Sequence, residues 1–351
     1  MEDTMKKALR KLFALSLAAA LTLSLSACGQ TNTGSAGSGG NTSTPTQSSN
    51  TSASGFPDST ITILVGFSAG SGTDLGARLL ANSLSEVLGV PVVVENTPGS
   101  GSWMVWNQLI KNTEADGYTL AAINQNFALG KYDPDTPREF TLDDVTLLAS
   151  QAIDPNIMAI RADETRFTDF PGFVEYAQNN EVFVAVQTVG ITDGDATMTE
   201  WLRKEFGCNI TLVPVDSASD GRTMFIAGDV DVYFASVGDV YTYVQEGTMD
   251  AVVVFNSERS DFLPDVPTIY ELGYDNAISA YSARGYCCPK GTDPEIVEIL
   301  TNAMVEAMES EEHQEQLAAL GVESNITTGE DFYNLLESQL TNRLDIWEID
   351  A

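Results

Sequence analysis

Residues 61–74 read ITILVGFSAGSGTD, a β-branched run that leads through a turn of small residues into the start of a helical pattern. Such strand, turn and helix units recur along the chain, and their alternation is typical of a parallel or mixed sheet covered by helices. The sequence therefore predicts the α/β class. Strands are expected at residues 60–66, 91–95, 118–123, 156–161, 182–187, 210–215, 231–235, 251–255 and 284–289, and the clearest helices at 74–88, 294–308 and 331–346.

The turn at residues 66–74 has the composition of a small-anion site. Gly70 and Gly72 allow backbone N–H groups to approach a ligand, and the start of the following helix adds a partial positive charge. Further hydroxyl donors come from Ser68, Ser71 and Thr73. A phosphate-binding loop is excluded because no Gly-Lys-Ser/Thr follows. The alternative is a plain turn capped by Thr73 or Asp74.

A second loop of this kind spans residues 187–197, QTVGITDGDAT, between another predicted strand and helix. Two such loops from different halves of the chain would face each other across a cleft and hold the two ends of one small ligand. Asp193 and Asp195 are unusual in such a loop. Either they cap the helix or stay in solvent, or one of them contacts a cationic or hydroxyl group of the ligand.

The N-terminal region predicts export. Residues 5–28, MKKALRKLFALSLAAALTLSLSAC, form a short basic start, an apolar core and a small-residue stop, as in a signal peptide. Cys28 after Leu-Ser-Ala resembles a lipobox, so we expect cleavage after residue 27 and a lipid on Cys28. Residues 28–55, rich in Gly, Ser and Thr, are expected to be a disordered tether that holds the folded body roughly 30 Å from the membrane.

The composition of the remaining chain excludes several classes of partner and chemistry. The formal charge of the whole chain is −33, and it is −35 without residues 1–27, whose own net charge is +2. Such a negative charge argues against nucleic acid as a partner. Cys208, Cys287 and Cys288 are too few for a disulfide framework and are expected to be buried thiols, with a bridge from Cys208 as the alternative. His313 is the one histidine, so we expect neither a zinc site nor a His-assisted nucleophile, and no cofactor is implied.

Several short motifs in order carry a resemblance to a known family. They are Phe67 with Gly70, Thr73-Asp74 and Ala77-Arg78; residues 91–96 with Pro98-Gly99; residues 116–120; residues 228–232; Arg259 with residues 263–268, Glu271 and Gly273; residues 289–292; and residues 317–321. From about residue 57 to its end, the chain resembles the substrate-binding receptors of tripartite tricarboxylate transporters, the TctC or Bug family.

The resemblance implies a two-domain clamshell of the periplasmic-binding-protein type, with a mixed sheet flanked by helices in each domain. Residues 56–157 and 284–351 would form the first domain and residues 158–283 the second, with hinge strands near 156–161 and 282–286. Such receptors hold a carboxylated metabolite, pass it to a membrane permease and catalyse nothing. We expect a monomer attached to the membrane by its lipid alone.

Carried over by position, the ligand loops of the family correspond to residues 67–74 and 188–196. The expected ligand-binding residues are Phe67, Ser68, Gly70, Ser71, Gly72, Thr73, Asp74, Thr188, Gly190, Thr192, Asp193, Gly194 and Asp195, with Asn124, Gln125 and Ser236 as further lining residues. Trp103 has two interpretations, a core residue or a pocket wall that favours an apolar ligand body.

The chain departs from the family pattern in both loops. Gly70-Ser71 replaces the usual Gly-Gly pair, and the second loop carries Asp193 and Asp195 and lacks the usual histidine. Extra carboxylates would oppose a dicarboxylate ligand unless one is protonated or points away, so an amino acid is an alternative ligand.

A lipoprotein sensor for the same ligands is the alternative function, and an exported hydrolase would need a nucleophile and base that the motifs do not supply.

Overall fold

The computed structural model describes residues 55–187 and 190–350. The predictions for the leader, Cys28, the tether before residue 55, and Thr188 lie outside the described residues. The first sheet has the strand order β10-β4-β9-β3-β1-β2. Its strands are β1 (Ile61–Val65), β2 (Val92–Asn96), β3 (Thr119–Asn124), β4 (Val145–Arg161), β9 (Tyr281–Pro289) and β10 (Glu323–Ser324). Strands β2, β1 and β3 are parallel to one another. Strand β9 runs antiparallel to β3, and β4 runs antiparallel to β9, so the sheet is mixed.

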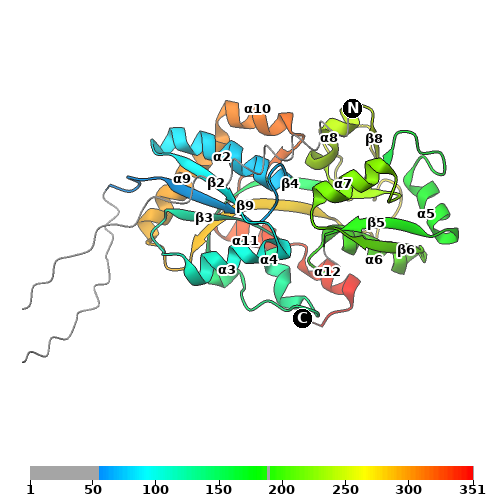
Figure 1. Cartoon of the computed structure of the whole chain (residues 1–351), viewed down its shortest axis with the longest axis horizontal. Helices are drawn as coiled ribbons and strands as arrows, with labels where there is room; N and C mark the ends of the chain where they lie inside the picture. Colours follow the sequence, from blue (N-terminus) through cyan, green and yellow to red (C-terminus); the bar gives the residue numbers. More distant parts are fainter. Residues whose placement is uncertain (1–54, 188–189, 351) are drawn as a thin grey trace, which may run out of the picture. The chain divides into compact units, whose positions relative to one another are not determined.

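Strand β4 belongs to two sheets. Residues 145–155 pair with β9, and residues 156–161 lie between β7 (Tyr233–Ser236) and β8 (Met249–Val254). Two further parallel strands, β5 (Val182–Val186) and β6 (Ile210–Pro214), join the second sheet through a bridge between Val184 and Val232. The chain thus carries one continuous strand from the first sheet into the second (Figure 1).

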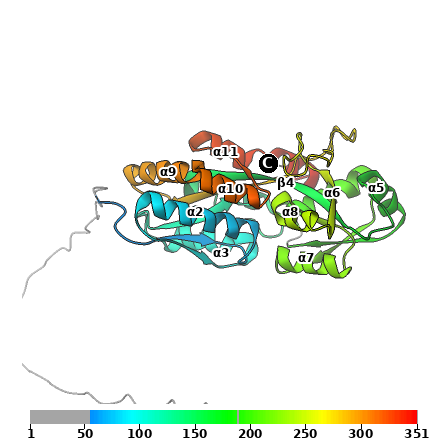
Figure 2. The same ribbon diagram turned by 90° about the horizontal axis from the view of Figure 1, so that it is seen from above.

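Helices cover both faces of the first sheet (Figures 1 and 2). On one face, Leu80 and Leu84 of α2 pack with Leu300 and Met304 of α9. On the other face, Trp106 of α3 belongs to the same core cluster as Phe127 of α4 and Phe332 of α11. The helices of the first face are α2 (Gly72–Leu88), α9 (Pro294–Glu309) and α10 (Glu311–Ala319); those of the second are α3 (Trp103–Asn112), α4 (Asn126–Leu129) and α11 (Gly329–Glu337). Short 3-10 turns occupy Ser100–Ser102, Gly130–Tyr132 and Leu142–Asp144.

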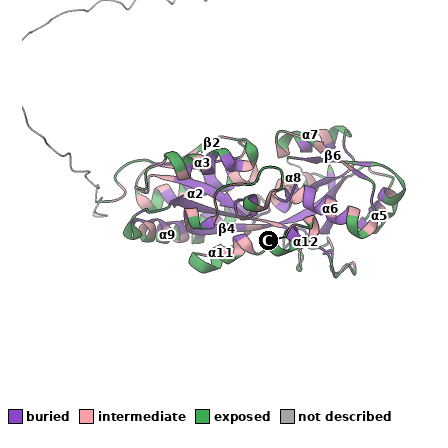
Figure 3. Ribbon diagram, turned by 90° about the horizontal axis from the view of Figure 1, so that it is seen from below, coloured by how far each residue is buried: buried purple, intermediate pink, exposed green. Residues whose placement is uncertain are grey.

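The second sheet is covered in the same way because side chains alternate along its strands. Met158 and Ile160 of β4 face α5 (Phe170–Asn179) and α6 (Gly194–Phe206), whereas Ile157 and Ala159 face α7 (Ala218–Ala227) and α8 (Val237–Gln245). The last helix, α12 (Leu340–Trp347), packs against α6, where the Trp347 indole donates to Thr197 Oγ1 at 3.1 Å. Figure 3 shows the strands buried between the exposed outer faces of the helices.

The α/β class and the mixed sheets with flanking helices are confirmed. Each of the nine predicted strands is present, eight of them with ends shifted by at most three residues, whereas the strand predicted at 156–161 is only the last part of β4, which begins at Val145. The single helix predicted at 331–346 is wrong, because α11 ends at Glu337 and α12 begins at Leu340. Between them Ser338 Oγ donates to the Leu335 carbonyl at 2.6 Å, and Gln339 Nε2 donates to the Tyr281 carbonyl of β9 at 2.6 Å. These contacts hold the chain in the break between α11 and α12. The spacing of the apolar residues in the sequence does not reveal this break.

The cysteines and the histidine are core residues. Cys208, Cys287 and Cys288 are buried, as predicted, and all three are free thiols. Burial raises the pKa of the Cys208 thiol to about 11. His313 is fully buried, with its ring nitrogens 3.3 Å from Ser83 Oγ and 3.2 Å from Gln151 Nε2, and burial lowers its pKa.

Residues 55–187 and 190–350 contain no group of three or more His, Cys, Asp or Glu that could hold a metal ion, and no helix among them is both long and apolar enough to cross a bilayer.

Candidate functional site

A cavity of about 420 Å³ lies where several strands end. Its lining includes the residues that directly follow β1, β5 and β6 and the last residues of β3 and β7. Helices α2, α6, α7 and α8 each begin at this cavity, with Gly72, Gly194, Ala218 and the cap residue Ser236 in its wall. The carboxyl ends of strands and the N-termini of helices therefore meet at one place, which is the usual position of a ligand site in α/β proteins.

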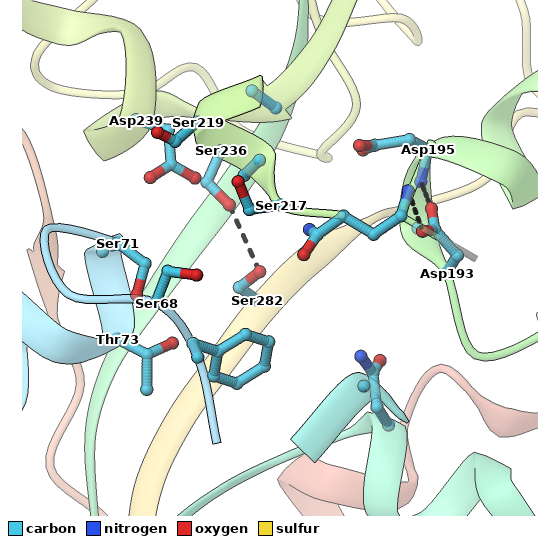
Figure 4. Close-up of a pocket in the computed structure, with 18 of the residues that line it drawn as sticks. Ser68, Ser71, Thr73, Asp193, Asp195, Ser217, Ser219, Ser236, Asp239 and Ser282 are labelled. Carbon is cyan, nitrogen blue, oxygen red and sulfur yellow. Dashed lines mark hydrogen bonds between the residues drawn. The ribbon is translucent and has the colours of Figure 1, made fainter. Parts of the chain in front are cut away.

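The first predicted loop lines this cavity. Its lining residues include Phe67, Ser68, Gly70, Ser71, Gly72 and Thr73. Ser71 Oγ accepts a hydrogen bond from the Asp74 backbone N–H at 3.3 Å and so caps α2. Figure 4 shows Ser68, Ser71 and Thr73 together on one side of the cavity. Their hydroxyls and the amides at the start of α2 that have no partner within the helix are hydrogen-bond donors on this side of the cavity.

Asp74 does not line the cavity but stabilises the loop from behind. Its Oδ2 accepts from the Gly70 N–H at 2.8 Å, its Oδ1 accepts from Asn96 Nδ2 at 2.8 Å, and it pairs with Arg78 at 3.0 Å. Burial alone would raise the pKa of Asp74, but the bonds from Arg78, Gly70 and Asn96 together hold it below its usual value. The carboxylate is therefore charged and fixed at neutral pH, and it orients the turn without facing the ligand space.

The second predicted loop contributes Asp193, Gly194 and Asp195 to the lining, whereas Gly190 and Thr192 are outside it. Asp193 is the N-cap of α6: its Oδ1 accepts from the Asp195 and Ala196 N–H groups at 2.8 and 2.9 Å. Its Oδ2 accepts from the Gln187 N–H at 3.1 Å. The structure thus places Asp193 in the helix-capping role that the sequence offered as one interpretation (Figure 4).

Asp195 is an acidic side chain of this wall whose pKa is shifted by its surroundings. Burial raises its pKa well above the usual value, and the nearby charges of Asp193 and Asp239 act in the same direction, with Arg343 opposing them. These surroundings favour the protonated form of Asp195 over the charged form. A protonated Asp195 removes part of the repulsion that the sequence raised against an anionic ligand.

The weaker candidates also reach the cavity. Asn124 and Gln125 line it at the end of β3, and Gln125 Oε1 accepts from the Ala283 N–H of β9 at 2.9 Å. Ser236 lines it at the end of β7 and donates to Ser282 Oγ at 3.2 Å (Figure 4). Trp103 is outside the lining: it is 3% exposed and stacks on Phe127 with ring centroids 5.1 Å apart, so it is a core residue.

Several lining residues were not predicted. A third loop after β6 brings Asp216, Ser217 and Ser219 to the cavity, and α8 brings Asp239. The signal for this loop was present, because Asp-Ser-Ala-Ser follows a predicted strand and Ser217 Oγ accepts from the Asp220 N–H at 3.2 Å as a helix cap. Other lining residues come from strands and a helix with no local motif, among them Asn156, Ser282, Arg284 and Arg343.

The lining carries several groups that attract an anion. Four helix N-termini bring partial positive charge to the cavity wall, and serine and threonine hydroxyls add donors. Arg343 is buried behind the acidic wall, where its Nη1 donates to the Ile191 carbonyl at 3.0 Å. Burial lowers the pKa of Arg343 to about 10, so it stays cationic at neutral pH.

A buried ion pair lies below the cavity. Arg284 Nη2 donates to Asp154 Oδ2 at 2.7 Å, and Asp154 Oδ1 accepts from the Gly238 N–H of α8 at 3.1 Å. Asp154 is fully buried, and burial raises its pKa to about 6, with the charge of Arg284 lowering it and that of Asp239 raising it. Asp154 is therefore ionised at pH 7 and becomes protonated in mildly acidic solution.

The raised pKa of Asp154 predicts a distinct pH dependence of stability. The folded chain holds this proton up to about pH 6, whereas an unfolded aspartate releases it near its model value of 3.8. Its contribution to the free energy of unfolding should therefore decline by about 2 kcal/mol as the pH rises from 4 to 6, and level off above about pH 7. Urea unfolding of the wild type and of Asp154→Asn at pH 4 to 7.5 measures the difference. A difference that does not change over this range would contradict the prediction.

Comparisons with known proteins agree with this fold. Residues 76–348 match the family model described as "Tripartite tricarboxylate transporter family receptor". A "UPF0065 protein in gbd 5′ region" of Cupriavidus necator is 31% identical over 278 residues, 77% of this chain and 81% of that protein. Protein BugT of Bordetella pertussis is 28% identical over 79% of this chain and 85% of its own.

Solved structures show the same architecture. The periplasmic binding protein BugD has a TM-score of 0.75 at 23% identity, over 84% of this chain and 98% of its own. MatC from Rhodopseudomonas palustris, with bound malate, has a TM-score of 0.73 at 24% identity, over 83% and 99%. An R. palustris protein with adipate reaches 0.76 at 22% identity, over 84% and 99%. At these identities the structures support the fold of the chain, and their ligands are properties of those proteins.

Proposed function

Because this chain belongs to the tripartite tricarboxylate transporter receptor family, we propose that it is an extracytoplasmic solute receptor that captures a small carboxylate in the cavity described above and delivers it to a membrane permease. It acts by binding alone, without catalysis. The proposed domains are residues 56–157 with 284–351, and residues 158–283, with the cavity between them. The observation that carries the proposal is the convergence of four helix N-termini and the first loop on one cavity.

The geometry favours a carboxylate over a neutral solute. The first turn of α2 presents N–H groups that have no partner within the helix, and Ser68 and Thr73 stand beside them. A carboxylate oxygen accepts several such bonds at once, and charge-assisted bonds of this kind are about twice as strong as neutral ones. The proposed ligand contacts are the predicted residues that line the cavity: Phe67, Ser68, Gly70, Ser71, Gly72, Thr73, Asn124, Gln125, Asp193, Gly194, Asp195 and Ser236.

A thermal-shift screen tests the proposed function. The panel consists of malate, adipate, glutamate and benzoate, which cover dicarboxylates, an amino acid and an aromatic acid, with glucose and choline as uncharged and cationic controls. An acid at 100 times its Kd should stabilise the folded state by about 2.7 kcal/mol and raise the melting temperature by several degrees. A panel in which every acid leaves the melting temperature unchanged, or in which glucose or choline is the best ligand, would contradict the proposal.

The lipid anchor is proposed from the sequence around Cys28. A lipidated receptor stays near its permease, and this raises the effective concentration of the pair without any additional contact. In a bacterial host the wild type should fractionate with membranes and enter the detergent phase of Triton X-114. Cys28→Ser should move to the aqueous phase, because the lipid has no other attachment thiol at the cleavage site. A Cys28→Ser protein that still partitions with detergent would show that another segment is the anchor.

A further inference from the structure

One arginine of the cavity lining is buried on strand β9. Arg284 is 6% exposed and lies in register between Asn124 of β3 and Ala152 of β4. It lines the cavity, although no sequence motif marks it. A charged side chain this deeply buried needs partners for its donors, since an unpaired buried donor lowers stability.

One nitrogen of this guanidinium, Nη2, is hydrogen-bonded within the protein. Nη2 donates to Asp154 Oδ2 at 2.7 Å, and Asp154 is held in turn by the Gly238 N–H at 3.1 Å. Within residues 55–187 and 190–350, no hydrogen bond joins Nη1 or Nε of Arg284 to a protein acceptor. Because Arg284 is in the cavity wall, these two nitrogens are donors for whatever occupies the cavity.

The guanidinium also lies against the first turn of α2. A Cβ added to Gly72 would come within 2.6 Å of Arg284 Nη2 and 2.8 Å of Nη1. Glycine at this position therefore leaves room for the guanidinium beside the helix N-terminus. A full positive charge and the partial charge of the free amides are thus adjacent, and both attract the same anionic group.

We propose that Arg284 binds the carboxylate of the ligand at the N-terminus of α2, and that Asp154 is the positioning residue that fixes the guanidinium in this place. This role of Arg284 rests on the proposed function, and it makes Arg284 the residue that recognises the negative charge of the ligand. It also orients the ligand: the carboxylate lies toward α2 and Arg284, and the part of the ligand next to Asp195 and Asp239 is uncharged or cationic.

The test compares acids with their amides on the full-length protein. Isothermal titration measures Kd for malate, adipate, glutamate and benzoate and for malamide, adipamide, glutamine and benzamide. The variants are Arg284→Lys, Arg284→Gln and the double variant Arg284→Gln/Asp154→Asn, which removes both charges so that no buried carboxylate is left unpaired. Lys111→Gln, on the surface of α3, removes the same charge away from the cavity and is the matched control.

The expected result is a Kd for the bound acid that is roughly 10 to 100 times weaker in the double variant, as for loss of hydrogen bonds to a charged group. Affinity for the amide should change little, so the preference for acid over amide is lost, and Arg284→Lys should keep part of it. A further variant, Asp154→Asn, retains Arg284 but no longer fixes its guanidinium, so it should also reduce the preference. Lys111→Gln should match the wild type.

Two failures are distinguishable. If none of the four acids binds the wild type, the proposed function is wrong and this inference is wrong with it. If an acid binds the wild type and the double variant loses less than tenfold in affinity, or keeps the preference for acid over amide, the proposed function stands and the role of Arg284 is overturned. Circular dichroism at the titration temperature establishes that each variant is folded.

Discussion

Replacing Trp106 by alanine is expected to lower the free energy of unfolding by about 4 kcal/mol, since large aromatic to alanine changes in cores cost roughly 3 to 5 kcal/mol. Trp106 is fully buried, its Nε1 donates to the Ala122 carbonyl of β3 at 2.9 Å, and its ring packs edge-on against Trp103 and Phe127. The substitution removes these contacts and also leaves a buried carbonyl without its donor.

Urea unfolding followed by circular dichroism measures this loss. Met104 is the matched control, because it is on the same helix and is 51% exposed. Met104→Ala should change the free energy of unfolding by less than about 0.5 kcal/mol. A loss below about 2 kcal/mol for Trp106→Ala would mean that the core of α3 and α4 rearranges around the smaller side chain.

The substitution Gly66→Ala is expected to have the second large effect. It should lower both the stability of the fold and the affinity for the ligand. Gly66 directly follows β1 and lines the cavity, and a Cβ here would be 2.5 Å from Ser102 Cα. Ser102 is fully buried with φ at +75°, so its backbone has little freedom to move away. The first loop must shift instead, at a cost of about 1 to 3 kcal/mol in stability, and the shift displaces the donors at the start of α2.

The expected result is at least a tenfold weaker Kd for the acid that stabilises the wild type, because binding groups displaced by a fraction of an ångström lose their geometry. Gly89→Ala is the control at the opposite end of α2. Gly89 has φ at +69° and open space around it, so alanine there strains the backbone by about 1 kcal/mol without moving the loop. If Gly89→Ala weakened binding as much as Gly66→Ala, loss of stability rather than displacement of the loop would be the cause.

The sequence predicted those parts of the fold and site that depend on local patterns. Strand β1 with its loop is an apolar run followed by glycines and hydroxyls, and the observed element differs from the expected one by a residue at each end. Ser68 and Thr73 line the cavity because they belong to the turn and the helix start that come after that strand. The same rule would have found Ser217, which also follows a predicted strand.

The parts that were not predicted depend on pairing between distant segments. Residues 145–155 of β4 include Ser150, Gln151 and Asp154, which are buried although polar, so they do not read as an apolar strand. Each is satisfied by a distant partner: Ser150 Oγ donates to the Asn325 carbonyl, and Gln151 Nε2 donates to the Gly76 carbonyl. Arg284 is in the cavity for the same kind of reason, because only the register of β9 places it there. Such residues have no local signal in a single sequence.

The 17 residues of β4 belong to both sheets. A strand that supplies ladder hydrogen bonds to two sheets couples their unfolding, because neither sheet can lose its part of β4 without exposing the core of the other. The backbone amides of this strand are therefore the ones that should remain protected from deuterium longest. The receptor should denature in a single cooperative step, so that partly melted forms, on which extracytoplasmic proteases act, stay rare.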